Sequence, residues 1–144
     1  MKALIQRVTS SSVEVDGTNV GQINKGLLVF IGIEKLDELS HADKMINKIL
    51  TYRVFSDEND KMNLSVIDIN GDVMLVPQFT LAADTKNGTR AGFSTAMKPL
   101  EAENIYDYMV EKFTTFVNIQ SGVFGADMKV SLVNDGPVTF LLEC

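Results

Sequence analysis

Hydrophobic and polar residues alternate along the first segment of the chain, a pattern typical of strands with one buried face. The alternation begins at Ala3 and resumes after Asp16-Gly17, a pair that favours a tight turn between two strands. After Asn24-Lys25-Gly26 the chain turns into an uninterrupted apolar run over residues 27–33. Such a run indicates a strand covered on both faces. We therefore expect this strand at the centre of a sheet.

A helical period replaces the alternation from Ser40 onward. The apolar positions of this segment fall on one face of a helix, and they are Ala42, Met45, Ile46, Ile49 and Leu50. Ser40 with Asp43 resembles a helix-capping pair. A second helix is predicted from about Pro99, because proline suits the first turn and Glu101 suits the helix dipole. The apolar stripe of the second helix contains Ile105, Met109, Phe113 and Phe116.

Asn70-Gly71 gives a second strong turn signal, between strand-like segments at residues 64–69 and 72–79. These segments are therefore predicted to form a hairpin. The connection from Leu81 to Lys98 has no clear period, and a loop of that length inside a compact domain is often functional.

The C-terminal segment KVSLVNDGPVTFLLEC contains a proline where a strand would begin. Asp135-Gly136 signals a hairpin between residues 130–133 and residues 138–142. Pro137 follows directly, and a proline there removes a backbone donor from the sheet. The Gly136-Pro137 peptide therefore needs a reason beyond turning the chain.

Strands, helix, strands, helix and strands follow one another along the chain, which predicts an α+β fold. Because the connections between strands read as hairpins, we expect a strongly curved, largely antiparallel sheet or partial barrel with two covering helices. Residues 1–144 are interpreted as a single domain, since this length suits one domain and no linker or repeat interrupts it.

Composition and charge narrow the classes of function. The formal net charge of −6 argues against a general nucleic-acid coat or a membrane-surface protein, so we expect neither DNA nor a membrane as a partner. The apolar run at residues 26–33 is too short to span a bilayer. The N-terminus has neither the apolar core nor the cleavage site of a signal peptide. A cytoplasmic protein is the expectation.

Few side chains are available for covalent or metal chemistry. His41 is the only histidine and Cys144 the only cysteine, so neither a multi-histidine site nor a thiolate cluster can form within one chain. A Ser-His-Asp hydrolase is disfavoured, because neither a GxSxG elbow nor a plausible cysteine nucleophile accompanies His41. The chain has no phosphate-binding or dinucleotide-binding glycine motif and no calcium loop. We expect no metal and no cofactor.

Two polar clusters at predicted strand ends remain to be explained. In PQFTLAAD, Gln78 and Thr80 supply an amide and a hydroxyl beside the long loop, and NDGPV contains the Gly136-Pro137 peptide. Such groups form a binding site in some proteins and ordinary turns in others, and the residues alone leave both interpretations open. The long loop is locally basic through Lys86, Arg90 and Lys98.

Both clusters resemble signature motifs of the D-aminoacyl-tRNA deacylases. PQFTL at residues 77–81 is similar to the family's SQFTL motif, and NDGPVT at residues 134–139 matches its Gly-Pro motif. The likeness extends in the same order to MKALIQRVTSSSVEVDG, ADTKNG and GVFGADM, so it spans nearly the whole chain. One departure is Pro77, which replaces the family's serine and removes both a hydroxyl and a backbone N–H.

The resemblance implies a homodimeric hydrolase that cleaves the ester between a D-amino acid and the terminal adenosine of tRNA. It also implies removal of glycine mischarged on tRNA-Ala, and a cis Gly136-Pro137 peptide that reaches the site of the partner subunit. The carbonyl groups of that peptide would accept hydrogen bonds from the α-ammonium of the substrate. An L side chain would then strike the wall of the site, which gives chiral proofreading by steric exclusion.

The resemblance further assigns roles to individual residues. Gln78, Phe79 and Thr80 are expected to line the ester and the adenosine, with the backbone N–H of Phe79 suited to an oxyanion. Thr80 is either a nucleophile or a positioning hydroxyl, and we favour attack by water because no base is evident. The other substrate-binding candidates are Arg7 and Pro77 near the reacting groups, Phe124 and Met128 at the adenine, and Lys86 and Arg90 at phosphates. Arg7 is expected to hold the Gly-Pro segment through its backbone.

Two alternatives stay open at this point. The chain could be a non-catalytic dimeric module that binds tRNA ends or a small ligand, its activity weakened by Pro77. It could instead hydrolyse other acyl esters or amides, in which case simple D-amino acid esters would react without any tRNA.

Overall fold

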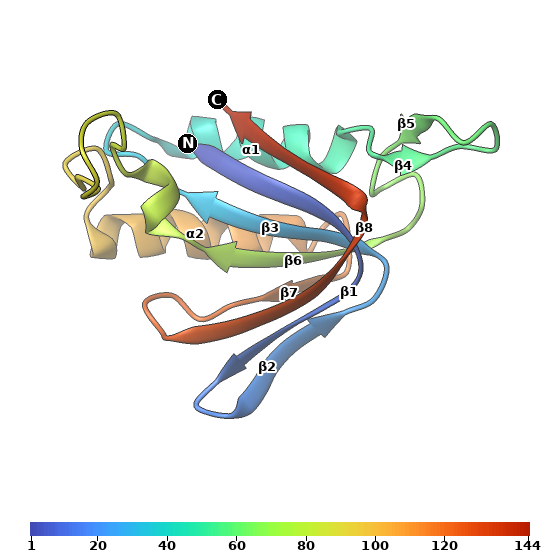
Figure 1. Cartoon of the computed structure of the whole chain (residues 1–144), viewed down its shortest axis with the longest axis horizontal. Helices are drawn as coiled ribbons and strands as arrows, with labels where there is room; N and C mark the ends of the chain where they lie inside the picture. Colours follow the sequence, from blue (N-terminus) through green and yellow to red (C-terminus); the bar gives the residue numbers. More distant parts are fainter.

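The central strand of the structure is β3 (Gly26–Gly32), as the apolar run predicted. The computed structural model describes residues 1–144, and β3 lies in a six-stranded sheet of order β2-β1-β3-β6-β7, with β8 paired to β1 (Figure 1). Side chains on both faces of β3 are buried, Leu27 and Leu28 among them. The remaining strands of this sheet are β1 (Lys2–Val15), β2 (Thr18–Ile23), β6 (Asp72–Pro77), β7 (Ile119–Ser121) and β8 (Met128–Glu143).

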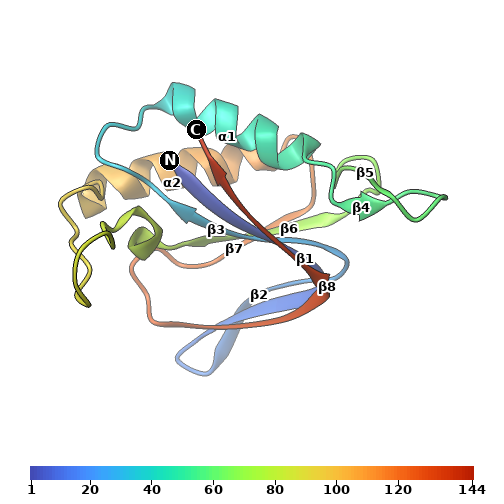
Figure 2. The same ribbon diagram turned by 45° about the horizontal axis from the view of Figure 1, so that its top comes forward.

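Two helices, α1 (Leu39–Thr51) and α2 (Pro99–Phe113), cover one face of the sheet (Figures 1 and 2). The apolar face predicted for α1 is buried, and so is the stripe predicted for α2 as far as Phe113. Phe116 was wrongly assigned to that stripe, because it lies beyond the end of α2 and its side chain is 53% exposed. None of the helices has the length and apolar character that crossing a membrane requires.

The start of α1 differs from the prediction. Glu38, not Ser40, is the N-cap, and the carboxylate of Glu38 accepts the backbone N–H of His41. In return, Nδ1 of His41 accepts the backbone N–H of Glu38 at 3.0 Å. The only histidine therefore serves as half of a capping box.

The sheet curls so far that its second face is covered by the sheet itself (Figure 2). Val8, Val13 and Ile23 from β1 and β2 pack there against Leu28 and Met74 in a core separate from that beneath the helices. β1 pairs antiparallel with β2, β3 and β8, whereas β6 runs parallel to both β3 and β7. The predicted α+β fold with a strongly curved sheet and two covering helices is confirmed.

The predicted hairpin at Asn70-Gly71 is wrong. The turn itself exists, since Asn70 has a positive φ of 51°, but residues 65–70 form turns rather than a strand. Asp68 holds these turns by accepting the backbone N–H and the hydroxyl of Ser65, each at 2.8 Å. The strand before them, β5 (Met62–Leu64), pairs with β4 (Phe55–Ser56) in a separate two-stranded sheet.

The predicted hairpin at Asp135-Gly136 is also wrong, because residues 128–143 form one long strand. β8 follows β1 on both sides of the Gly-Pro segment, with Val8 opposite Asn134 and Gln6 opposite Thr139. Four residues of β8 therefore face a single residue of β1, Arg7, and they bulge out of the ladder. A strand with a continuous partner does not need to turn back at a glycine.

Candidate active site

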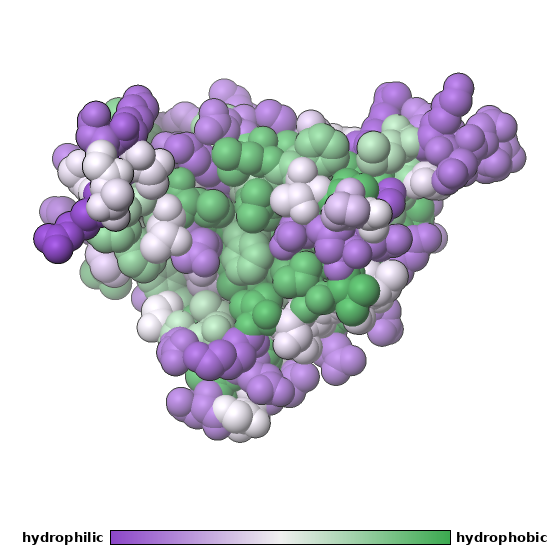
Figure 3. All heavy atoms as spheres, viewed as in Figure 1, coloured by the Kyte–Doolittle hydropathy of each residue, from purple (hydrophilic) through white to green (hydrophobic).

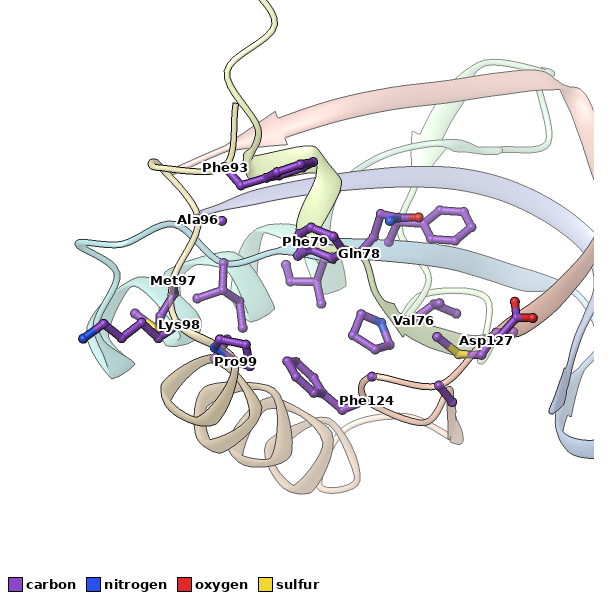
Figure 4. A pocket seen from close by; sticks show the side chains of 18 of the residues that line it. Val76, Gln78, Phe79, Phe93, Ala96, Met97, Lys98, Pro99, Phe124 and Asp127 are labelled. Carbon is purple, nitrogen blue, oxygen red and sulfur yellow. The ribbon is translucent and has the colours of Figure 1, made fainter. Parts of the chain in front are cut away.

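A pocket of about 770 Å³ opens where β3 and β6 end. Its walls come from the 3₁₀ helix η1 (Phe79–Ala82), from the segment at residues 93–99 and from the loop that joins β7 to β8 (Figure 4). Thirteen of its 19 lining residues are hydrophobic, so the pocket suits a largely apolar group that carries a few polar atoms.

A glycine in the central strand lets η1 sit directly over the end of the sheet. A Cβ at Gly32 would lie only 2.7 Å from the Cβ of Leu81 and 3.2 Å from the carbonyl oxygen of Gln78. The chain enters η1 through a hydrogen bond of 2.8 Å from the backbone N–H of Gln78 to the carbonyl of Ile31. The PQFTL residues are therefore attached to the centre of the fold.

Gln78 lines the pocket, whereas Thr80 is exposed on η1 and is not one of the lining residues. The side-chain amide of Gln78 donates to Oγ1 of Thr80 at 2.6 Å. An amide cannot take up a proton near neutral pH, so this contact orients the hydroxyl without activating it as a nucleophile. The backbone N–H of Phe79 opens η1, where a helix leaves its donors without helical partners, and no side chain caps this end. The arrangement offers hydrogen bonds to a substrate but no general base.

Phe124 and Met128 line the same pocket, as expected. The Phe124 ring packs against Tyr106 of α2, with ring centroids 5.9 Å apart. The hydroxyl of Tyr106 lies within hydrogen-bonding distance of the carbonyls of Leu75 at 2.9 Å and Gly122 at 3.1 Å. Burial raises the pKa of Tyr106, which therefore stays neutral and can act as a donor. The sequence analysis missed this residue, because an apolar stripe does not reveal what a hydroxyl within it contacts.

Pro77 breaks no pairing of the sheet. The N–H of Val73 donates to the carbonyl of Asn118, just before β7, and the carbonyl of Leu75 accepts from Gly122, so the odd-numbered residues of β6 face β7. In this pattern the missing N–H of Pro77 would point to the carbonyl of Gly122, which receives the Tyr106 hydroxyl instead. The backbone donor lost at Pro77 is thus replaced by a side chain from α2.

The Gly136-Pro137 peptide is cis, as expected, and it does not line the pocket of its own chain. Figures 1 and 2 show the bend of β8 at the opposite end of the sheet from η1. Gly136 has a φ of +153°, and a Cβ there would lie 2.7 Å from the N atom of Val138, so only glycine fits. Both residues of the peptide are exposed.

Two side chains hold the bulge from either side. Nε of Arg7 donates to the carbonyl of Asp135 at 2.8 Å, which confirms the expected backbone contact, and its Nη1 donates to the carbonyl of Val54 at 2.7 Å. Asn134 accepts the N–H of Val138 at 2.7 Å and donates to the carbonyl of the same residue at 3.2 Å. The bulge is a defined structure rather than a loose loop.

The basic loop lies beside the pocket, but Lys86 and Arg90 do not line it. Both are exposed, whereas Lys98 belongs to the wall, where Figure 4 shows its side chain pointing away from the cavity. Phe93, in the same loop, does line the pocket and was missed by the sequence analysis.

Exposed hydrophobic side chains gather on β8. They are Leu132, Val133, Phe140 and Leu141. Figure 3 shows a hydrophobic area across the middle of the face that β8 crosses. Contiguous apolar surface of this kind marks an interaction site in many proteins.

A family model described as D-Tyr-tRNA(Tyr) deacylase matches residues 4–143 of the chain. The chain belongs to this family. A D-aminoacyl-tRNA deacylase from Vibrio cholerae is 54% identical over 143 residues, and one from Aliivibrio fischeri is 53% identical over 143 residues. Each of these comparisons covers 99% of this chain and 99% of the relative.

Two solved structures share the fold. The structure of a protein named c-Myc DNA Unwinding Element Binding Protein is 39% identical, with a TM-score of 0.96 over 100% of this chain and 99% of the other. A probable eukaryotic D-amino acid tRNA deacylase is 14% identical, with a TM-score of 0.86 over 98% and 97% of the two chains. The second likeness concerns the fold alone.

The deacylase-family motifs fall into two groups in this chain. Gln78, Phe79, Phe124 and Met128 lie around one pocket, together with Pro77. Gly136 and Pro137 lie apart from that pocket, on the exposed bulge of β8 held by Arg7. Within one chain the structure does not bring the two motifs together.

Proposed function

We propose that this protein hydrolyses the ester bond between a D-amino acid and the terminal adenosine of tRNA, and that it rejects L-aminoacyl-tRNA. The family match over residues 4–143 carries the proposal. The pocket supports it, because a mostly apolar cavity of about 770 Å³, lined by Gln78 whose amide holds the Thr80 hydroxyl, suits a nucleoside that presents its ester beside these two groups.

The active form in this proposal is a homodimer, in which the Gly136-Pro137 bulge of one subunit completes the pocket of the other. Two observations favour this arrangement. The bulge is exposed and does not line the pocket of its own chain. The hydrophobic side chains that β8 exposes, such as Val133 and Leu141, would also be removed from water in a subunit interface.

Substrate recognition in this proposal begins with the amino group. The carbonyls of Gly136 and Pro137 accept hydrogen bonds from the α-ammonium, and bonds to a charged donor are strong enough to fix its position. The ester is held by the opposite subunit, so an L side chain strikes the wall while a D side chain points outward. Glycine has no side chain to exclude, so glycine mischarged on tRNA-Ala is a substrate as well.

Hydrolysis proceeds by attack of water on the ester carbonyl. The water oxygen bonds to the carbonyl carbon, the bond from that carbon to the ribose oxygen breaks, and a proton of the water ends on the ribose oxygen. The N–H of Phe79 stabilises the developing oxyanion, while Gln78 and Thr80 orient the ester and the water. This assignment is favoured because the partner of Thr80 is an amide and the only histidine caps α1.

Contact with the RNA is confined to the acceptor end in this proposal. Lys86 and Arg90 meet phosphates there, since both are exposed on the loop that adjoins the pocket. A small footprint fits the net charge of −6 and implies weak salt dependence. We extend the proposal to a cytoplasmic location.

The decisive experiment compares D-Tyr-tRNA with L-Tyr-tRNA under identical conditions, with release of the amino acid as the readout. We expect hydrolysis of the D substrate only. Equal hydrolysis of the two substrates would overturn the proposal, and so would hydrolysis of neither substrate at high enzyme concentration. A third arm offers a simple D-tyrosine ester, and rapid turnover of this ester would favour a general esterase.

The role of Thr80 has its own test. We expect Thr80→Ala to retain turnover within about tenfold of the parent rate, because a positioning hydrogen bond is worth about that factor. Thr80→Ser is the matched control, since it keeps the hydroxyl. Complete loss in the alanine variant together with normal rates in the serine variant would instead identify Thr80 as a nucleophile.

A further inference from the structure

Two phenylalanine rings stand half exposed at the mouth of the pocket. Phe79 is 58% and Phe93 49% exposed, and their ring centroids lie 5.2 Å apart at an interplanar angle of 50°. Figure 4 shows the two rings side by side on one wall, with Phe124 across the cavity. Neither ring belongs to the hydrophobic core. Packing within this chain therefore does not account for the pair.

The backbone that carries Phe93 is held in place by hydrogen bonds. Asp84 and Gly92 exchange two of them, at 2.8 and 2.9 Å, and these close the loop immediately before Phe93. On the other side, the hydroxyl of Thr95 donates to the carbonyl of Ala82 in η1. The Phe93 ring is thus presented to solvent by a fixed segment beside Phe79, which limits the ordering cost when a ligand binds.

The charge of the same loop indicates what kind of ligand the rings receive. Residues 84–98 contain three basic residues, Lys86, Arg90 and Lys98, and one acidic residue, Asp84. This loop is therefore positively charged, although the whole chain has a net charge of −6. Exposed aromatic rings beside cations are the usual surface for single-stranded nucleic acid, since bases stack on the rings while the cations meet the backbone.

We propose that Phe93, together with Phe79, is a stacking platform for the base of the nucleotide that precedes the terminal adenosine of the substrate RNA. This inference rests on the proposed function, which places the terminal adenosine inside the pocket. The rest of the RNA must then leave through the mouth, where the two exposed rings lie. Phe93 is a specificity residue for the RNA chain and does not touch the ester.

The test uses two substrates that differ by the nucleotides outside the pocket, D-Tyr-tRNA and D-tyrosyl-adenosine. Stacking on one aromatic side chain contributes enough that we expect Phe93→Ala to raise KM for D-Tyr-tRNA about tenfold. Its kcat/KM for D-tyrosyl-adenosine falls by a clearly smaller factor than that for D-Tyr-tRNA, because Phe93 also lines the pocket but this substrate has no preceding base to stack on the ring. Phe93→Tyr keeps the ring and retains the parent KM on both substrates.

Two further variants and a direct binding measurement make the outcome decisive. Phe116→Ala is the matched control, because Phe116 is 53% exposed but lies away from this pocket, and it should leave both KM values unchanged. Phe93→Leu keeps apolar bulk without a ring and should behave as the alanine variant does. Affinities for the trinucleotide CCA and for adenosine, measured directly, test the platform independently of catalysis, and Phe93→Ala should weaken binding of the trinucleotide by a larger factor than binding of adenosine.

Equal loss on both substrates would overturn the inference, because Phe93 would then serve the pocket interior. No loss on either substrate, or conversion of a dimer to a monomer by Phe93→Ala in size-exclusion chromatography, would overturn it as well. Failure of the proposed function is recognised separately, as absence of hydrolysis by the parent protein, and the CCA affinities still decide the role of Phe93 in that event.

Discussion

Pro77 and Pro137 both stand in strands of one sheet, yet the sheet compensates for them in different ways. Pro77 is the last residue of β6, and β7 beside it has already ended. The proline has no N–H for the carbonyl of Gly122, and the Tyr106 hydroxyl contacts this carbonyl instead. Pro137 lies in the middle of β8, where the ladder opens and two side chains, Arg7 and Asn134, hold the bulge.

The difference concerns what each proline exposes. Around Pro77 the pairing of β6 with β3 continues without a bulge, and the replacement donor is the Tyr106 hydroxyl of α2, on the buried side of the sheet. Around Pro137 the supporting side chains come from Arg7 of β1 and from Asn134 of β8 itself, and the Gly136-Pro137 peptide bulges out into solvent. A proline in a strand can therefore end the pairing without distorting the sheet, or it can expose backbone carbonyls to a partner. Which of the two happens depends on the side chains that replace its missing N–H.

Removing Arg7 should disturb the exposed bulge at Pro137, and we expect it to have the largest effect. Arg7→Met leaves the part-buried carbonyls of Asp135 and Val54 without their charged donor. We expect the free energy of unfolding in urea to fall by about 3 kcal/mol. The kcat/KM for D-Tyr-tRNA should fall about a hundredfold, since small displacements of a binding group have effects of that size.

Arg7→Lys is the control for charge, because a lysine retains the charge but has no planar fork with which to reach both carbonyls. It should recover only part of the stability and activity. Unchanged kcat/KM in Arg7→Met would contradict a functional role for the bulge.

Asn134→Ala tests the second support of the bulge. The variant loses bonds to the N–H and the carbonyl of Val138, so we expect a loss of about 1–2 kcal/mol in stability and about a tenfold loss in kcat/KM. Asn134→Asp keeps the acceptor for the N–H and should lose less. If the alanine variant has greater losses than Arg7→Met, our ranking of the two supports is incorrect.

Tyr106→Phe tests the buried side of the comparison. The ring that packs on Phe124 remains, while the carbonyl of Gly122 loses its donor. We expect about 1–2 kcal/mol of destabilisation, and a KM a few times higher with kcat little changed, because the pocket wall loosens but the reacting groups stay. Tyr108→Phe, on the same helix, is the control for an exposed hydroxyl: it loses the hydrogen bond to Asp43, so it should lower stability by less than Tyr106→Phe and leave KM unchanged. A fall in kcat alone would argue against this account.

Pro77→Ser should have the smallest effect, because the carbonyl of Gly122, which a backbone N–H at position 77 would face, already contacts the Tyr106 hydroxyl. We expect kcat/KM within about threefold of the parent protein. The assay also decides between an enzyme and a non-catalytic binding module, since a large gain from near zero would mean that Pro77 had removed the activity.

The sequence predicted what local patterns can encode. The burial of β3 follows from its apolar run, and the α1 face follows from its helical period, because each needs only neighbours along the chain. The parallel pairing of β6 with β3 was missed, since Asn70-Gly71 gives a turn but does not say which strand the chain joins next. β8 was divided in two because its continuous partner, β1, lies more than a hundred residues earlier.

The site was predictable to the same extent. The motif residues came from family resemblance, and the structure places Gln78, Phe79, Phe124 and Met128 at one pocket. Phe93 and Tyr106 were not foreseen, because their roles depend on the ring and the carbonyls that folding brings beside them. A phenylalanine in a basic loop is a signal that could have been used.

Gly32 links the stability of the sheet to the geometry of the rim. Any side chain there would have to displace Leu81, and the Gln78 carbonyl lies nearly as close. A mutational scan read out by activity and one read out by protein abundance should therefore report the same sensitivity at this position. At Phe93, which is exposed, the two scans should disagree. Substitutions in the loop can therefore alter the rim of the pocket without loss of the fold, whereas substitutions in the central strand cannot.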